Sequence, residues 1–117
     1  MKLGVVISTN DAETVWNAFR LANFSRGKGD EVRVFLIGKG VEYERTSDVK
    51  FDSVGEAKMF IQAGGRIMAC GTCMKIRQEE ESEICLISTL KDLYELVGES
   101  DKIVTFSGSD QKQFLIS

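Results

Sequence analysis

Two cysteines, Cys70 and Cys73, lie three positions apart in the stretch GGRIMACGTCMKIR, which spans residues 64–77. Cysteine pairs at this spacing can carry three kinds of chemistry. They supply half of a tetrahedral metal site, they form a reversible disulfide, or one thiolate attacks sulfur with the second thiol beside it. The choice among these depends on where the fold places the two side chains.

The composition of the chain bears on each alternative, because it has three cysteines, no histidine and no proline. A structural zinc site needs four ligands, so Cys70, Cys73 and Cys85 would need a carboxylate or a second subunit to complete it. A dithiol oxidoreductase of the thioredoxin type normally has a cis-proline facing its CxxC motif, which this chain lacks. Both stay open as alternatives to sulfur handling, for which we expect no metal or other cofactor.

The elements that must position these cysteines follow from the hydrophobic pattern. Short apolar runs predict strands at residues 2–8, 31–38, 66–70, 84–88 and 102–106. Helical spacing predicts helices at 11–25, 53–63 and 89–97, with a short one after Cys73. The predicted helix starts are Asn10, Ser53 and Thr89, each followed three positions later by an acidic residue. Residues 41–51 are polar and weakly patterned, which predicts a loop or a partly ordered segment.

Strands that alternate with helices along a whole chain indicate an α/β fold with a mainly parallel sheet and helices on both faces. We therefore predict a three-layer α/β/α sandwich. In such a sheet, reactive residues collect beyond the carboxyl ends of the strands. Cys70 ends the third predicted strand, so it should lie at this edge and be reachable from solvent. The loops after the first two strands are expected to wall a small pocket there, with Ser8, Thr9, Asn10, Gly38 and Lys39.

Cys70 has the sequence surroundings of a reactive thiol. Gly71, Thr72 and a predicted helix start follow it, and unpaired backbone N–H groups at a helix start favour a neighbouring anion. Lys75 and Arg77 add positive charge within two turns. We expect these groups to lower the thiol pKa of Cys70 and to support an anionic sulfur.

The other two cysteines are predicted to differ from each other. Cys73 has three open interpretations: it forms a disulfide with Cys70, takes over a bound sulfur, or faces inward as a small apolar residue. Its N–H would also support an anionic sulfur on Cys70. Cys85 lies within the apolar run ICLIS, so we predict that it packs in the core.

The overall composition excludes other classes of function. The 117 residues carry a net charge of −3 without a basic patch, so nucleic-acid binding is not expected. The apolar start of the chain is too short for a signal peptide, and no apolar run has the length of a membrane helix. An odd number of cysteines suits reduced thiols, so we expect a cytoplasmic location.

Three segments together resemble the DsrE/DsrF-like family: VRVFLIGKGVEY, GGRIMACGTCMKIR and ISTLKDLYELVGESDKIVTF. The similarity runs through residues 1–106, which we expect to form a single domain, with a tail at 107–117. The resemblance implies a five-stranded parallel sheet between two helical layers and an oligomer, with a homotrimer or homohexamer favoured. It also implies a strand-end cysteine that carries a persulfide between donor and acceptor proteins. The residue that matches this position is Cys70.

The sequence therefore predicts a small sulfur-handling protein that uses Cys70, with Cys73 as its neighbour. The tail is polar until the run FLI at residues 114–116. This apolar run is expected to pack either on its own domain or on a neighbouring subunit.

Overall fold

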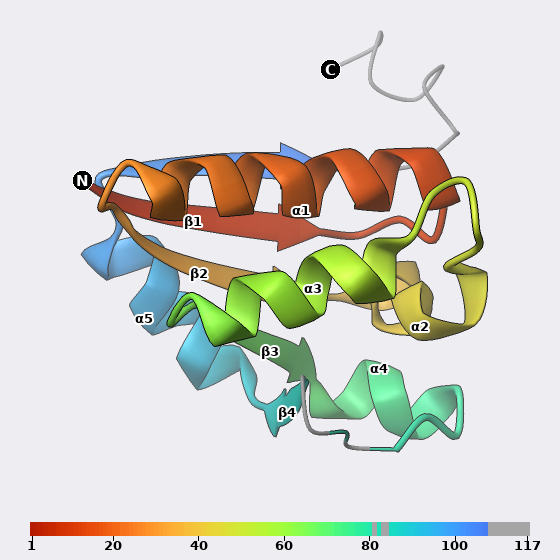
Figure 1. Cartoon of the computed structure of the whole chain (residues 1–117). Coiled ribbons are helices and arrows are strands. Elements are labelled where there is room, and N and C mark those ends of the chain that lie inside the picture. The colour runs from red at the N-terminus through yellow and green to blue at the C-terminus, as the bar shows by residue number, and fades with distance from the viewer. Residues whose placement is uncertain (81, 83–84, 108–117) are drawn as a thin grey trace, which may run out of the picture.

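Five parallel strands form one sheet in the computed structural model, which describes residues 1–80, 82 and 85–107 (Figure 1). The strands lie in the order β4-β3-β2-β1-β5, and every neighbouring pair is parallel. Their bounds are β1 (Lys2–Ile7), β2 (Glu31–Leu36), β3 (Arg66–Cys70), β4 (Leu86–Ser88) and β5 (Lys102–Phe106). The predicted α/β class is confirmed.

Helices cover both faces of the sheet, which gives the predicted three layers (Figure 1). α1 (Ala12–Gly27) and α3 (Ser53–Gln62) pack on one face, and α5 (Leu90–Glu99) lies on the other. Strand side chains alternate between these layers. The larger core lies beneath α1 and α3 and includes Val5 and Ile7 of β1. A smaller core under α5 joins Leu96 to side chains of β2 and β3, and Cys70 belongs to this smaller core.

Residues 41–51, predicted to be a loop or a partly ordered segment, contain the end of one short helix and the whole of another. η1 (Gly38–Glu42) follows β2, and α2 (Tyr43–Thr46) continues from it. Tyr43 is 1% exposed and stacks at a tilt against Phe19 of α1, with ring centroids 5.5 Å apart. A single buried aromatic in a polar run gives no periodic pattern. A tertiary contact therefore orders the first part of this segment, which agrees with the alternative of a partly ordered segment.

Helix starts were predicted to within one residue. Asp11, rather than Asn10, caps α1, and its carboxylate accepts the N–H of Thr14 at 3.0 Å. Asp52, rather than Ser53, caps α3 in the same way. Adjacent residues that are equally good N-caps cannot be ranked from sequence alone. The capping box of Thr89 with Asp92 at the start of α5 is confirmed.

The third strand ends at Cys70 as predicted, and α4 (Gly71–Ile76) begins at the next residue. β4 begins at Leu86, so it is shorter than the strand that was predicted at residues 84–88. Among the residues that the structure describes, no helix has both the length and the apolar character needed to cross a membrane.

Candidate functional site: a pair of thiols at the end of β3

Cys70 lies at the carboxyl end of β3, at the N-cap position of α4. Its side chain is 5% exposed and packs with Phe35, Met68 and Leu96 on the face that α5 covers. Its place at the strand end agrees with the sequence analysis. The expectation that this thiol is reachable from solvent is wrong, because Leu96 of α5 packs in the same small core and Cys70 is buried there.

The backbone around Cys70 approaches it closely but does not cap its sulfur. Among the described residues, the Cys70 side chain accepts no capping hydrogen bond from the first turn of α4. Gly71 lies against β4, where a Cβ would come within 3.1 Å of Ile87 and 3.2 Å of the Ser88 carbonyl. The absence of a side chain at Gly71 therefore allows α4 to pack closely on β4. Thr72 is exposed, and support of an anionic sulfur by these N–H groups stays a prediction.

Cys73 lies in the first turn of α4 and is half-buried between the two cores. The N–H of Gly38 donates to its sulfur at 3.3 Å, and the Cys73 side chain packs against the small core that contains Cys70. Gly38 has a φ of 58°, a left-handed conformation that suits glycine. The turn that follows β2 is thus folded so that its first amide points at Cys73. Neither cysteine of the pair is in a disulfide.

The surroundings of Cys73 keep it protonated. Burial raises the pKa of the Cys73 thiol, and the neighbouring Cys70 raises it further. The Gly38 N–H and the charge of Arg77 lower it by less. Cys73 is therefore a neutral thiol at neutral pH. The thiolate that we expect on Cys70 stays a prediction.

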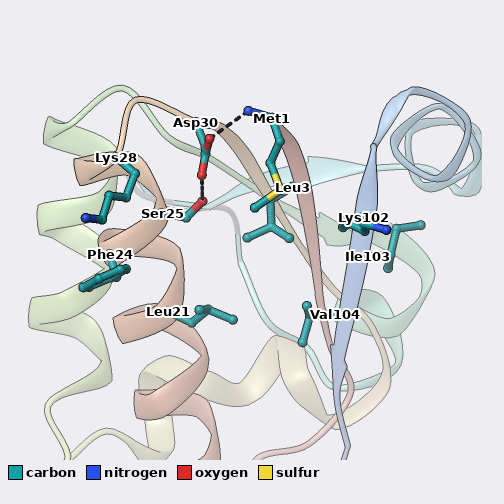
Figure 2. Close-up of a pocket in the computed structure, with 10 residues that line it drawn as sticks. All are labelled: Met1, Leu3, Leu21, Phe24, Ser25, Lys28, Asp30, Lys102, Ile103 and Val104. Atoms are coloured by element: carbon teal, nitrogen blue, oxygen red, sulfur yellow. Dashed lines mark hydrogen bonds and ion pairs between the residues drawn. The ribbon is translucent and has the colours of Figure 1, made fainter.

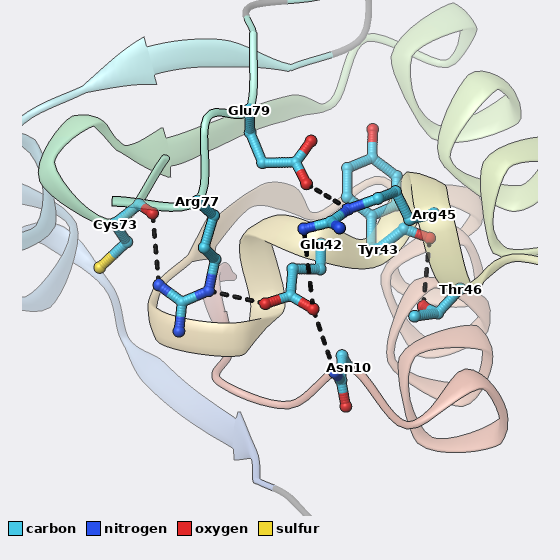
Figure 3. Close-up of polar contacts among 8 residues, drawn as sticks. All are labelled: Asn10, Glu42, Tyr43, Arg45, Thr46, Cys73, Arg77 and Glu79. Carbon is cyan, nitrogen blue, oxygen red and sulfur yellow. Dashed lines mark hydrogen bonds and ion pairs between the residues drawn. The ribbon is translucent and has the colours of Figure 1, made fainter. Parts of the chain in front are cut away.

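A polar network holds η1 against α4 (Figure 3). The Arg77 Nε donates to Glu42 Oε2 at 2.7 Å, and Asn10 Nδ2 donates to Glu42 Oε1 at 3.2 Å. A second N–H of Arg77 donates to the carbonyl of Cys73 at 3.3 Å. The hydrogen bond from Asn10 and then the one from Arg77 lower the pKa of Glu42. This ionised carboxylate joins the loop after β1, η1 and α4, and so fixes Gly38 opposite Cys73.

The structure brings together only part of the predicted site. Gly38 and Arg77 each form a hydrogen bond with Cys73. Asn10 is linked to Cys73 indirectly, through Glu42 and then Arg77. The remaining predicted wall and support residues have no hydrogen bond to either thiol among the described residues; they are Ser8, Thr9, Lys39, Thr72 and Lys75. Thr9 is 2% exposed and accepts the N–H of Asp11, so it orders the loop.

Glu42 is the residue of the network that sequence reasoning missed. It lies 35 positions from Arg77 along the chain. The run VEYER carries no local signal that sets Glu42 apart from the other charged residues around it. Only the position of η1 beside α4 reveals its role.

Cys85 is 3% exposed and packs in the larger core beneath α1 and α3, as predicted. The sheet separates it from Cys70, which lies in the core under α5. In the described part of the chain, no group of three or more His, Cys, Asp or Glu side chains is arranged to hold a metal ion.

The fold and the site define a class of small α/β/α proteins with a cysteine at the carboxyl end of the third strand. The chain belongs to the DsrE/DsrF-like family, whose model matches residues 1–106. The family resemblance drawn from the sequence motifs is thereby confirmed.

Two archaeal proteins are similar in sequence. The protein MJ0989 of Methanocaldococcus jannaschii is 31% identical over 115 residues, which cover 91% of this chain and 100% of that protein. MK0008 of Methanopyrus kandleri is 31% identical over 100 residues, which cover 80% of this chain and 83% of that protein.

Two solved structures share the fold. YchN from E. coli has a TM-score of 0.77 at 20% identity, and the match covers 91% of this chain and all of YchN. BT1422 from Bacteroides thetaiotaomicron has a TM-score of 0.72 at 22% identity, over 89% of this chain and 93% of BT1422. At these identities the likeness concerns the fold alone.

Proposed function

We propose that the protein carries sulfur as a persulfide on Cys70 and that Cys73 is the thiol that discharges it. The observation that carries this proposal is that Cys73 packs against the small core that contains Cys70, at the carboxyl end of β3. Membership of the DsrE/DsrF-like family supports the sulfur chemistry. Donor and acceptor would be proteins or small persulfides and thiols in the cytoplasm.

Loading is a transfer between two sulfurs. The Cys70 thiolate attacks the outer sulfur of a donor persulfide, the donor's S–S bond breaks, and the donor leaves as a thiolate. Cys70 then carries one extra sulfur. This step needs a thiolate and no histidine base. It also requires the donor to reach a thiol that is 5% exposed in this structure. The positive charge of Arg77, which already acts on Cys73, supports the negative outer sulfur of the product.

Two routes discharge the persulfide. An acceptor thiolate attacks the outer sulfur, which moves to the acceptor and restores the Cys70 thiolate. Alternatively, the Cys73 thiolate attacks the Cys70 sulfur, which forms a Cys70–Cys73 disulfide and releases hydrosulfide. The second route oxidises the pair, so an external thiol must reduce the disulfide before the next cycle. The raised pKa of Cys73 keeps this route slow at neutral pH and leaves time for an acceptor.

Loading is tested by incubation with a cysteine desulfurase and cysteine, followed by intact-protein mass spectrometry. The wild type should gain one sulfur, Cys70→Ser should gain none, and the matched control Cys85→Ser should load like the wild type. Cys73→Ser should load and then hold its sulfur longer, because the disulfide route is absent. Equal loading of wild type and Cys70→Ser contradicts the proposal.

A reversible dithiol switch is the second candidate, and the packing of Cys73 against the small core that holds Cys70 favours it. A redox titration without any sulfur donor distinguishes the two. A reversible Cys70–Cys73 couple, together with failure to load sulfur, would support the switch in place of the carrier.

A further inference from the structure

An apolar groove lies between α1 and β5, on the face of the sheet opposite the core that contains Cys70 (Figure 2). Its volume is about 460 Å³, which lies in the range of small-molecule sites, roughly 300–1,000 Å³. Leu21 and Phe24 line it from α1, and Val104 lines it from β5, with Leu3 of β1 between them. Phe24 is 65% exposed and Leu21 is 37% exposed. An apolar occupant would remove these side chains from water, which is favourable.

One end of the groove is polar, and its carboxylate is already occupied (Figure 2). Asp30 Oδ1 accepts a hydrogen bond from the amino group of Met1 at 2.8 Å, and Oδ2 accepts one from the Ser25 hydroxyl at 2.8 Å. The charge of the Met1 amino group balances that of Asp30. Asp30 is therefore not free to neutralise another cation that lines the groove.

Two lysines that line the groove have no acidic partner. Lys28 and Lys102 form no ion pair with any carboxylate in the described part of the chain. The Lys28 Nζ lies 5.3 Å from the centroid of the Phe24 ring, so its charge is held beside an apolar wall. Asp101, next to Lys102, accepts the backbone N–H of Lys2 and does not line the groove. The groove thus combines apolar walls with two unpaired positive charges.

An amphipathic anion complements both parts of the groove. The volume of about 460 Å³ has room for about fifteen non-hydrogen atoms, at roughly 30 Å³ for each water-sized group. A straight-chain carboxylate of about ten carbons stays within this limit. Its chain would cover the apolar walls, and its charged end would meet the lysines.

We propose that the groove binds a free medium-chain carboxylate, with its chain against Leu21, Phe24 and Val104 and its carboxylate beside Lys28 and Lys102. This site is independent of the sulfur chemistry, since the groove and Cys70 lie on different faces of the sheet. It is formed by described residues only, and the predicted tail at residues 108–117 lies outside the part of the chain that the structure describes.

The first test is a titration of the full chain with sodium decanoate, followed by nuclear magnetic resonance of labelled methyl groups. The methyl signals of Leu21 and Val104 should shift and saturate, with a dissociation constant of about 1 mM or below. Decylammonium chloride is the matched probe of opposite charge and should bind at least about tenfold more weakly. Absence of saturation with decanoate, or equal binding of the two probes, overturns the proposal.

The second test uses variants at exposed positions, which the fold tolerates best. The double substitution Lys28→Gln with Lys102→Gln should weaken decanoate binding by about tenfold, because two exposed charge pairs are lost. Phe24→Ser should also weaken it by about tenfold, because an apolar wall is lost. The matched controls are Lys58→Gln and Met59→Ser, two exposed residues of α3 that do not line the groove, and they should bind like the wild type. Unchanged binding in the groove variants, or equal weakening in the controls, overturns the proposal.

A vesicle experiment separates a free carboxylate from a membrane surface. The protein is sedimented with vesicles of phosphatidylcholine and phosphatidylglycerol, which present the same combination of acyl chains and negative charge. Protein that stays in the supernatant while it binds decanoate supports the proposal. Protein that sediments with the vesicles, and no longer does so after Phe24→Ser, overturns it and would place the groove on a membrane surface instead.

Discussion

Two thiols that lie three positions apart have different environments, and the difference comes from single contacts. Cys70 is surrounded by apolar side chains under α5, whereas Cys73 is half-buried and receives the N–H of Gly38. Cys73 is therefore the thiol that an external reagent meets first. Cys70 is the thiol whose product would be shielded from water, which would protect a reactive sulfur from side reactions.

The raised pKa of Cys73 predicts how its reactivity depends on pH. Because the pKa lies above the ordinary value of 9.0, the thiolate fraction should keep rising through pH 9. We expect the rate of iodoacetamide labelling at Cys73, located in the wild type by fragment-ion mass spectrometry, to increase across pH 7–10 with no plateau below pH 9. A plateau near pH 7 would show that Gly38 and Arg77 outweigh burial.

The lowered pKa of Glu42 predicts that the free energy of unfolding decreases in acid. Its folded pKa is lowered from the ordinary value of 4.5, mainly by the hydrogen bond from Asn10. Its contribution is therefore present above pH 4.5 and lost as the pH falls through the lowered folded value. Glu42→Gln should reduce the free energy of unfolding at pH 7 by about 1–2 kcal/mol. Urea unfolding of both proteins at pH 7 and at pH 3 checks this, and the gap between the two should narrow in acid.

At the scale of elements, the strands and the long helices could be predicted because their signals are local. β3 ends at Cys70 as the apolar run RIMAC indicates, and the capping box of Thr89 with Asp92 marks α5. η1 and α2 could not be predicted, because the burial of Tyr43 depends on Phe19, far away in sequence. Only part of the site could be predicted, because the rest also depends on contacts between residues far apart in sequence. The strand end locates the cysteines, but the Glu42–Arg77 ion pair arises only when η1 meets α4.

The close approach of η1 to β1 makes Gly40 a test of this element. A Cβ at Gly40 would collide with the carbonyl group of Ile7, whereas a Cβ at Gly98 in α5 would meet nothing within 4 Å. Gly40→Ala should destabilise the protein by about 1–3 kcal/mol, measured by urea unfolding. The matched control Gly98→Ala should be neutral or stabilising by up to about 1 kcal/mol, since alanine favours a helix. Equal effects of the two substitutions would mean that η1 can move away from β1 without cost.

For the whole molecule, the two outer layers are unequal. α1 and α3 together cover one face of the sheet, while α5 covers the other (Figure 1). α5 buries Leu96 against the sheet and exposes an apolar stripe of Leu90, Tyr94 and Val97 on its outer side. The stripe follows the helical spacing of one continuous face. An exposed stripe of this kind is typical of a surface that another protein covers.

The expected assembly is a prediction at this scale. We expect light scattering to give the mass of a homotrimer or homohexamer at micromolar concentration. Tyr94→Lys, which places a charge in the middle of the stripe, should lower the measured mass toward that of one chain. Lys91→Glu, on the solvated side of the same helix, is the matched control and should leave the mass unchanged. A monomeric wild type would contradict the expectation.

The position of Cys85 on the far side of the sheet from Cys70 makes its thiol an internal reporter of unfolding. Its thiol lies in the core beneath α1 and α3 and is 3% exposed. Alkylation of Cys85 therefore requires that this core open, whereas labelling of Cys73 does not. In one time course, label at Cys73 follows the chemistry of the site, and label at Cys85 counts the molecules that have unfolded. A variant that loses sulfur loading can thus be sorted at once into a damaged site or a damaged fold.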